Sequence, residues 1–440
     1  MMNMITLLTG LNRENGLHAP RTTFQPGQIL NGKIIKLFPN NIASLNIGSQ
    51  KVVAQLEASL DVQQRYWFQV QPGNGHIKLK VIARGVMDAP SSQAEISILS
   101  LMESLSIPNK GTRLEVLKYF LKEQLPINKE VIEKSAELLK TVKAQQNGFD
   151  AIKLLLQKQL PLTLETVNAM VAVLDEASLS KTIENVIALL QKEPPSDTRA
   201  KLALLLKEYV HSTHKIEQEM LVFKAGKQDV TPGLVQTSSI AEGLVKLIHR
   251  MGYSYENSLL QLLHNDKKNP DTMKPLLMNL LKEIGAEPLK TAVEKLLNKL
   301  TGVQLLSHEL SPMQHQVVQI PLFFQNQNLD LTVQWSGKKT DNDEIDPDYC
   351  RIVFFLELAN LGDTLIDMNV QNRIVSLTVM NNNEELKSIA QPLIPLLKES
   401  LHSVHYTLST VHFNPFIHSH KKPSINMMAG SAYSGVDLRI

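Results

Sequence analysis

The chain has 440 residues, of which 43% are hydrophobic, 20% charged and 5% aromatic. This composition is typical of a folded soluble protein and excludes both a largely disordered chain and a membrane-embedded one. At this length two to four domains are expected, and the scarcity of aromatic residues favours helices that pack through aliphatic side chains.

The net charge of +2 conceals two oppositely charged segments. Residues 21–84 hold eight Lys or Arg against two Asp or Glu, whereas residues 321–415 hold six Lys or Arg against twelve acidic residues. Opposite charge at the two ends indicates either different partners or mutual attraction, and ordinary variation between domains is the simpler alternative.

Residues 1–20 are interpreted as an N-terminal tail. They contain neither a basic cluster nor a long apolar stretch, so no secretory signal is expected, and no run in the chain is apolar enough to predict a membrane-spanning helix. Cys350 is the only cysteine, which excludes an intramolecular disulfide and a cysteine-rich zinc site. We therefore expect a cytoplasmic protein.

Residues 21–88 are predicted to form a small β-barrel, OB-like or SH3-like. Gly, Pro and Asn separate five short runs of β-forming residues. These runs are residues 29–37, 42–47, 52–56, 66–70 and 77–82.

The basic barrel raises the alternative of nucleic-acid binding, with Lys33, Lys36, Lys78 and Lys80 as the contacts. Its opening run, residues 27–35, resembles the first strand of S1-type RNA-binding barrels. Base stacking needs exposed aromatic side chains on the strands, and besides Phe38 the strands offer only three consecutive ones at 66–68, of which at least one must face inward. A structural barrel is therefore the favoured interpretation.

Residues 94–224 are predicted to be a helical repeat region. The sequence LEVLKYFLKEQLP at 114–126 aligns with FDAIKLLLQKQLP at 149–161, and a weaker third copy ends at residues 194–195. Each copy reads as a helix, a Leu-Pro stop and a second helix that begins near Asn128 or Thr163, a period typical of stacked helical hairpins.

Residues 238–305 are predicted to form a second helical group. Four glycines, Gly148, Gly252, Gly285 and Gly302, are interpreted as helix ends because glycine adopts the left-handed conformation that closes a helix.

From residue 316 the apolar period changes from helical to two, which predicts a C-terminal α/β domain at 316–415. Its expected strands are separated by a polar loop at 336–348 and, further along, by a turn at Gln371-Asn372; a helix at about 384–401 and a closing strand at 406–413 follow. The expected strands are residues 316–324, 329–335, 351–358, 364–370 and 374–380. Residues 416–440, rich in Gly, Ser and Lys, are predicted to be a disordered tail.

These elements predict an α+β multi-domain protein. It has a small N-terminal β-barrel, an all-α middle of helical hairpins and a C-terminal antiparallel sheet packed with one helix.

No catalytic or cofactor motif is present, so we expect a non-enzymatic protein without cofactor or metal. Two histidine pairs stand at helical spacing, at 211 and 214 and at 402 and 405, but two histidines alone make a weak ligand set. The acidic segment at 341–348 has Asp346 where a calcium loop needs glycine, which favours a solvated loop.

The segment at 354–370, FFLELANLGDTLIDMNV, resembles the C-terminal domain of the bacterial flagellar hook-length control protein family. That family combines a strand, a Leu-Gly step, a second alternating strand, a third strand, a Leu-rich helix and a final strand, and residues 316–413 supply these in order. The barrel is similar to the N-terminus of Gram-positive members. Two departures stand out: the family's Pro-Glu-Glu-like segment before the step is replaced by Leu-Ala-Asn, and the long disordered Pro- and Gln-rich half of many members is replaced by patterned helix.

The resemblance implies travel through the flagellar type III export apparatus and contact with the cytoplasmic part of its export-gate switch protein, which changes the class of exported substrate. Carried over by position, the implied contact residues are Leu358, Leu361, Gly362, Asp363 and Val370. A core role for the three apolar residues, and a stand-alone relative that measures no hook, remain alternatives.

Gly362 must carry the chain from one antiparallel strand into the next. A link this short commonly needs a positive φ, which glycine adopts freely, so we predict φ above zero at Gly362.

Overall fold

In the computed structural model the described residues fall into ranges that exclude most of both ends of the chain. They are residues 26–47, 50–58, 60–72, 77–84, 91–108, 111–123, 125–142, 145–175, 177–209, 234–253, 255, 272–285, 287–307, 313–324, 327–340, 344–358 and 360–416. The two predicted tails, residues 1–20 and 416–440, lie outside these ranges except for Phe416.

The chain divides into two compact units, one containing Asn15–Val167 and the other containing Asn168–Ile440. The predicted boundaries near residues 224 and 305 therefore do not separate independent cores. The division falls instead inside a helix, α6 (Leu164–Leu174).

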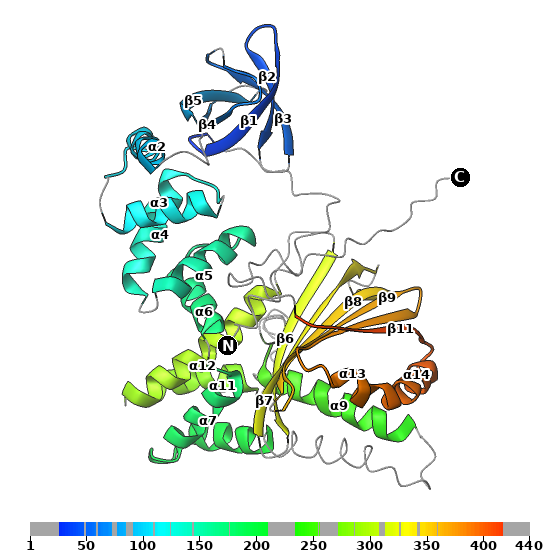
Figure 1. Ribbon diagram of the computed structural model, residues 1–440. Helices are drawn as coiled ribbons and strands as arrows, with labels where there is room; N and C mark the ends of the chain where they lie inside the picture. Colours follow the sequence, from blue (N-terminus) through cyan, green and yellow to red (C-terminus); the bar gives the residue numbers. More distant parts are fainter. Residues whose placement is uncertain are drawn as a thin grey trace. The chain divides into compact units, whose positions relative to one another are not determined.

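The first unit begins with a closed barrel in the order β1-β2-β3-β5-β4, in which β3 and β5 run parallel (Figure 1). Its core consists of aliphatic side chains around Phe68 and Tyr66. Because β4 pairs with β1 and β5, and β5 closes the barrel against β3, this connectivity is OB-type rather than SH3-type. The strands are β1 (Ile29–Phe38), β2 (Ile42–Ile47), β3 (Gln50–Leu56), β4 (Arg65–Gln71) and β5 (Lys78–Arg84).

Helices follow the barrel as predicted, and the repeat is visible in their ends. Leu125 and Leu160, thirty-five positions apart in the aligned copies, each donate a backbone hydrogen bond of 2.9 Å to the residue five positions earlier. Asn128 caps the next helix by accepting from the Val131 amide, and Thr163 accepts from the Thr166 amide at the equivalent place. The helices are α2 (Ser91–Ser104), α3 (Thr112–Lys122), α4 (Lys129–Thr141), α5 (Gln145–Gln157) and α6.

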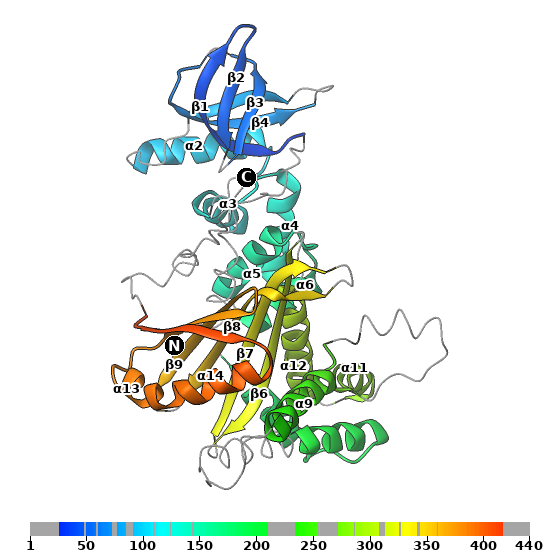
Figure 2. The same cartoon turned by 90° about the vertical axis from the view of Figure 1, so that its right-hand side faces the viewer.

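The second unit combines helices with a six-stranded sheet in the order β11-β10-β9-β8-β7-β6 (Figures 1 and 2). One core of this unit joins the helices to Val318 and Ile320 of β6, so the predicted helical group at 238–305 and the predicted domain at 316–415 share a core. The helices are α7 (Leu179–Leu190), residues 197–209, α9 (Leu234–Met251), α11 (Met273–Glu283) and α12 (Glu287–Leu306). The strands are β6 (Met313–Phe324), β7 (Gln327–Lys339), β8 (Ile345–Leu358), β9 (Gly362–Gln371), β10 (Ile374–Met380) and β11 (Thr407–Asn414).

The prediction of an antiparallel sheet with one helix needs two corrections. β10 and β11 pair in parallel, because the intervening helical segment crosses over the sheet and returns the chain in the same direction. That segment is α13 (Leu386–Ala390), a 3-10 turn η1 (Gln391–Leu393) and α14 (Ile394–Ser403). Pro392 and Pro395 stand at the starts of η1 and α14, where proline is tolerated, and they divide the predicted helix.

Two predicted links between strands differ from the structure, one in length and one in position. The polar loop at 336–348 is mostly strand, because β7 continues to Lys339 and β8 begins at Ile345. The turn between β9 and β10 consists of Asn372 and Arg373, one residue later than predicted, with φ of 51° and 62°. Both residues adopt the left-handed conformation that suits the twist of a two-residue hairpin.

Two of the four predicted glycine helix ends are wrong. Gly148 lies inside α5 and Gly302 inside α12, where close neighbours leave no room for a Cβ atom. Gly252, with φ of 81°, follows the end of α9, and Gly285 lies just beyond α11. Among the helices of the described ranges, none is long and apolar enough to cross a lipid bilayer.

Candidate partner-binding surface

The Leu-Gly step forms the loop between β8 and β9. Leu358 pairs with Gly362 across the two strands, and Gly362 has φ of 68°, which confirms the predicted left-handed conformation. Nothing lies within 4 Å of the position that a Cβ atom would occupy at Gly362. The glycine is therefore required by backbone conformation and not by a close neighbour.

Asn381, which the sequence analysis did not single out, holds this loop in place. The buried side-chain amide donates to the carbonyl oxygens of Leu361 and Asp363, at 2.9 and 3.0 Å, and lies 2.8 Å from the Thr364 hydroxyl. Its carbonyl oxygen accepts from the Asn383 amide, and its backbone amide donates to Asn414 of β11. One side chain thus fixes the loop relative to β10, β11 and the start of α13.

Four of the five implied contact residues lie at this end of the hairpin. Gly362 is exposed, and Leu358, Leu361 and Asp363 are half-buried. Partial burial raises the pKa of the Asp363 carboxyl above its ordinary value. The loop therefore offers two apolar side chains and one carboxylate to a partner.

Val370 does not belong to this surface, which corrects the implied contact set. It is 3% exposed and packs with Val375, Leu377 and Leu408 in the core beneath α14. It also lies eight residues along β9 from Gly362, a distance of about 26 Å in an extended strand. The alternation of β9 places Val370 on the covered face, so its role is packing.

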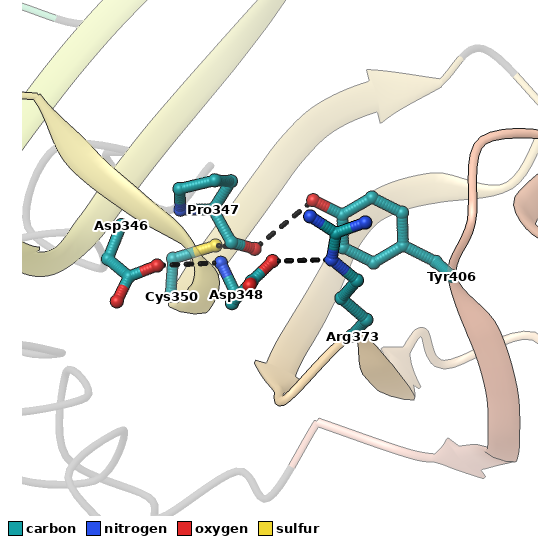
Figure 3. Close-up of polar contacts among 6 residues, drawn as sticks. All are labelled: Asp346, Pro347, Asp348, Cys350, Arg373 and Tyr406. Atoms are coloured by element: carbon teal, nitrogen blue, oxygen red, sulfur yellow. Dashed lines mark hydrogen bonds and ion pairs between the residues drawn. The ribbon is translucent and has the colours of Figure 1, made fainter.

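A polar cluster closes the opposite end of the hairpin (Figure 3). Arg373 donates to Asp348 through Nε at 2.8 Å, and the Tyr406 hydroxyl donates to the carbonyl oxygen of Pro347 at 3.2 Å. The Asp346 carboxylate accepts from the Asp348 backbone amide, so both acidic side chains have hydrogen-bond partners within the cluster. Burial raises the pKa of the Cys350 thiol, and the carboxylates of Asp346 and Asp348 add to this shift. The cluster ties both the β9–β10 turn and the entry of β11 to the start of β8.

The crossover helices expose more apolar surface than the sequence analysis expected. Ile389, Leu393 and Leu397 are each more than a third exposed, and their spacing of four residues places them along one side of α13, η1 and α14. Figure 2 shows α14 running along the sheet, and Ile394 and Leu401 are its contacts with the core. The spacing was present in the sequence, but a helix predicted to cover a sheet gave no reason to expect an exposed apolar side.

The barrel separates the four lysines of the nucleic-acid alternative. Asn46 on β2 pairs with Lys33 on β1 and with Lys51 on β3, so these two lysines lie one strand apart on either side of it. Lys36 on β1 pairs with Ser44 on β2 and lies on the same outward face. Lys78 and Lys80 lie on β5, which pairs with β4 and with the other end of β3. The lysine that sequence reasoning missed, Lys51, thus lies closer to the β1 pair than the two that it proposed.

Aromatic exposure on the barrel is limited. Tyr66 and Phe68 are buried, as the alternation of consecutive residues required, while Trp67 is half-buried. Phe38 is 41% exposed, and the Lys36 ammonium lies 5.3 Å from the centre of its ring.

Within the described ranges, no group of three or more His, Cys, Asp or Glu residues is arranged to hold a metal ion. His402 and His405 are exposed near the end of α14, and the other predicted pair, His211 and His214, lies outside the described residues.

Comparison with known proteins finds a relative that matches part of the chain. Over 231 residues the chain is 28% identical to a protein of Bacillus subtilis (strain 168) named "Uncharacterized protein YlqG". The match covers 51% of this chain and 40% of that protein, so the chain spans less than half of the relative's length. No family model and no solved structure matches the chain.

Proposed function

We propose that this chain is a non-enzymatic regulator that binds the cytoplasmic part of an export-gate switch protein of the flagellar type III apparatus, or a stand-alone homologue of it. The loop between β8 and β9 makes the contact. Binding there controls which substrates are exported, as the resemblance of residues 316–413 to hook-length control proteins implies.

The observation that carries the proposal is the rigid presentation of the Leu-Gly step. Gly362 turns the chain, and Asn381 donates to the loop's carbonyl groups, so that Leu361 and Asp363 are held at the surface in one conformation. A loop that is already ordered loses little conformational entropy on binding, which suits a recognition element.

The test is binding of the full-length chain to the cytoplasmic domain of the cognate export-gate protein, measured by calorimetry. Leu361→Asp should weaken binding by about tenfold or more, because it places a charge in an apolar contact. Gln371→Asp is the matched control, since Gln371 is exposed at the end of β9 that lies away from the loop. No binding at tens of micromolar, or equal losses in both variants, would contradict the proposal.

Hook measurement is a separable part of the proposal. Deletion of the gene should produce over-long hooks if the chain measures hook length, which electron microscopy of isolated hooks would reveal. Hooks of normal length together with export-gate binding would assign the chain to the stand-alone class.

A second candidate is binding of single-stranded nucleic acid by the barrel, favoured by the OB-type connectivity and by the outward row of Lys33, Lys36 and Lys51. Affinity would then fall steeply with salt, because lysines release counterions from phosphates. Alanine at these three positions should reduce both affinity and salt dependence, whereas alanine at Lys78 and Lys80 should change them less. Salt-independent binding, or none, would exclude this candidate.

A further inference from the structure

The two edge strands of the six-stranded sheet, β6 and β11, differ in whether their outward backbone groups are hydrogen-bonded. At the outer edge of β6, the Ser307 hydroxyl accepts from the Val317 amide at 2.9 Å and lies 3.2 Å from its carbonyl oxygen. The Tyr253 and Tyr209 hydroxyls donate to the carbonyl oxygens of Gln319 and Pro321, at 3.0 and 3.2 Å. Three alternate residues in the middle of β6, Val317, Gln319 and Pro321, are thus hydrogen-bonded to side chains, which hinders pairing with another strand there.

The outer edge of β11 has no such cover. The Thr407 amide and the Asn414 carbonyl both point toward β10, since they bond to Arg373 and Asn381. A register shift between Val375 and Ser376 leaves Ser409 unpaired, and this bulge reverses the alternation along the strand. Beyond the bulge Thr410, His412 and Asn414 face β10, so Val411 and Phe413 present their amides and carbonyls to the outside. Within the described part of the chain, no hydrogen bond reaches these groups on that side.

The side chains of β11 also lack the features that discourage pairing. Between Thr407 and Asn414 there is no Lys, Arg, Asp, Glu or Pro. Leu408, Val411 and Phe413 share the apolar side with Val375, Leu377 and Val379 of β10, while Thr410 and His412 lie on the other side. The open edge is therefore suited to an added strand with apolar side chains on one face and polar ones on the other.

The size of this edge limits what can occupy it. An eight-residue strand is about 26 Å long, and one strand added beside it buries less than the roughly 1,200 Å² of a stable interface between separate molecules. A segment tethered nearby needs far less area, because a short linker gives it a millimolar effective concentration. The edge thus favours a segment of the same chain over a second copy.

Such a segment follows β11 directly. Phe416 is held by Asn382 immediately after the strand, and the sequence continues from residue 417 to residue 440. Its last five residues, Val436-Asp437-Leu438-Arg439-Ile440, alternate apolar and polar side chains with a period of two. Residues 417–435 reach about 60 Å when extended, more than twice the length of β11.

We propose that residues 436–440 dock beside β11 as a seventh strand. Val436, Leu438 and Ile440 would then extend the apolar side formed by Leu408, Val411 and Phe413. Asp437 and Arg439 would lie on the polar side, with Thr410 and His412.

The test is amide hydrogen exchange of the full chain, compared with a chain truncated after Gly435. Exchange at Val411 and Phe413 should be about tenfold or more faster in the truncated chain, while the amides of β10 that bond within the sheet keep their rates. Leu438→Asp should behave like the truncation, and Arg439→Ala, which keeps the apolar alternation, like the full chain. A peptide of residues 432–440 should restore protection to the truncated chain only at millimolar concentration, which matches the effective concentration of the tethered segment.

Equal exchange at Val411 and Phe413 in the full and truncated chains would overturn the proposal. So would protection that survives truncation and rises with protein concentration, since a second copy would then occupy the edge. Circular dichroism spectra that agree among all variants ensure that the differences arise at the edge and not from unfolding.

Discussion

At Gly302 and Gly285 an added methyl group would meet opposite surroundings. A Cβ at Gly302 would lie 2.2 Å from Val173 and 2.3 Å from the carbonyl oxygen of Ala169, both on α6, whereas nothing lies within 4 Å at Gly285. Because a backbone atom blocks the first site, α6 and α12 would have to separate to admit a side chain.

We expect Gly302→Ala to lower the free energy of unfolding by about 3 kcal/mol, despite the higher helix propensity of alanine. Gly285→Ala should leave it unchanged or raise it by up to about 1 kcal/mol, since only the unfolded chain is affected. Urea denaturation of the two variants provides the comparison. Equal midpoints would mean that the helices do not approach so closely.

Gly362 is constrained by conformation alone. Its φ of 68° costs a β-branched residue about 1–3 kcal/mol, so Gly362→Val should lower the stability of the second unit by that amount. Gly362→Asn should cost less, because asparagine tolerates the left-handed region. Thermal unfolding distinguishes these outcomes, and identical melting temperatures for the valine and asparagine variants would argue against backbone strain.

At the scale of elements, the junction of α7 with β7 is built around a buried carboxylate. Asp330 accepts from the Leu179 and Ser180 amides at the first turn of α7, at 2.5 and 3.0 Å, and from the Gln319 side chain at 3.2 Å. Burial raises the pKa of Asp330, and these hydrogen bonds oppose that rise. The helix N-terminus supplies the positive potential that makes a buried carboxylate tolerable.

Asp330→Ala should therefore destabilise the second unit by about 2–4 kcal/mol, because it leaves two helix amides buried without an acceptor. Asp348→Ala is the matched control, since the Asp348–Arg373 pair is exposed and such pairs contribute less than about 1 kcal/mol. Guanidinium denaturation would separate the two. A similar small loss in both would show that water satisfies the α7 amides.

Lys299 gives this junction a dependence on pH. It is 2% exposed and donates to the carbonyl oxygen of Ala177, and burial lowers its pKa to about 8 against the attraction of Asp330 and Asp175. Lys295, paired with Asp175, adds like-charge repulsion. The protonated lysine is therefore less favourable in the folded chain than in the unfolded one.

Below pH 8 both states bind the proton, and between pH 8 and about 10.5 only the unfolded state does. This group's contribution to stability thus increases as the pH rises through that window. The free energy of unfolding of the natural chain, relative to Lys299→Met, should increase by about 2 kcal/mol between pH 7 and 9.5. Taking the difference in unfolding free energy between the two chains cancels the titration of all other groups. A difference that stays constant with pH would show that Lys299 keeps its ordinary pKa.

Local sequence patterns predicted most of the helices and strands. The errors concern features that depend on contacts between residues far apart in the sequence. All five barrel strands and the repeated hairpins follow from apolar alternation, turn residues and the repeated Leu-Pro stop. The parallel return of β11 does not, because strand direction depends on where α13 and α14 cross the sheet. Asn381 was equally hidden, since its acceptors at Leu361 and Asp363 lie far from it in sequence.

At the scale of the whole molecule, the chain consists of two units that meet within α6. The unit containing Asn15–Val167 has its own barrel core around Phe68, and the unit containing Asn168–Ile440 has a core to which Leu296 of α12 belongs. The sequence suggested more divisions, because changes in composition mark changes of secondary structure and not the limits of a shared core. Separate cores predict separate cooperative transitions.

Scanning calorimetry of the full chain should accordingly show more than one transition. Phe68→Ala removes a fully buried ring and should lower only the transition that includes the barrel, whereas Leu296→Ala should lower only the one that includes the sheet; each costs about 3–5 kcal/mol in its own unit. Hydrogen exchange below each melting temperature would assign the transitions to their residues. If both variants shift a single transition, α6 couples the two units into one cooperative whole, and a substitution in the barrel would then reach the sheet that carries the proposed partner contact.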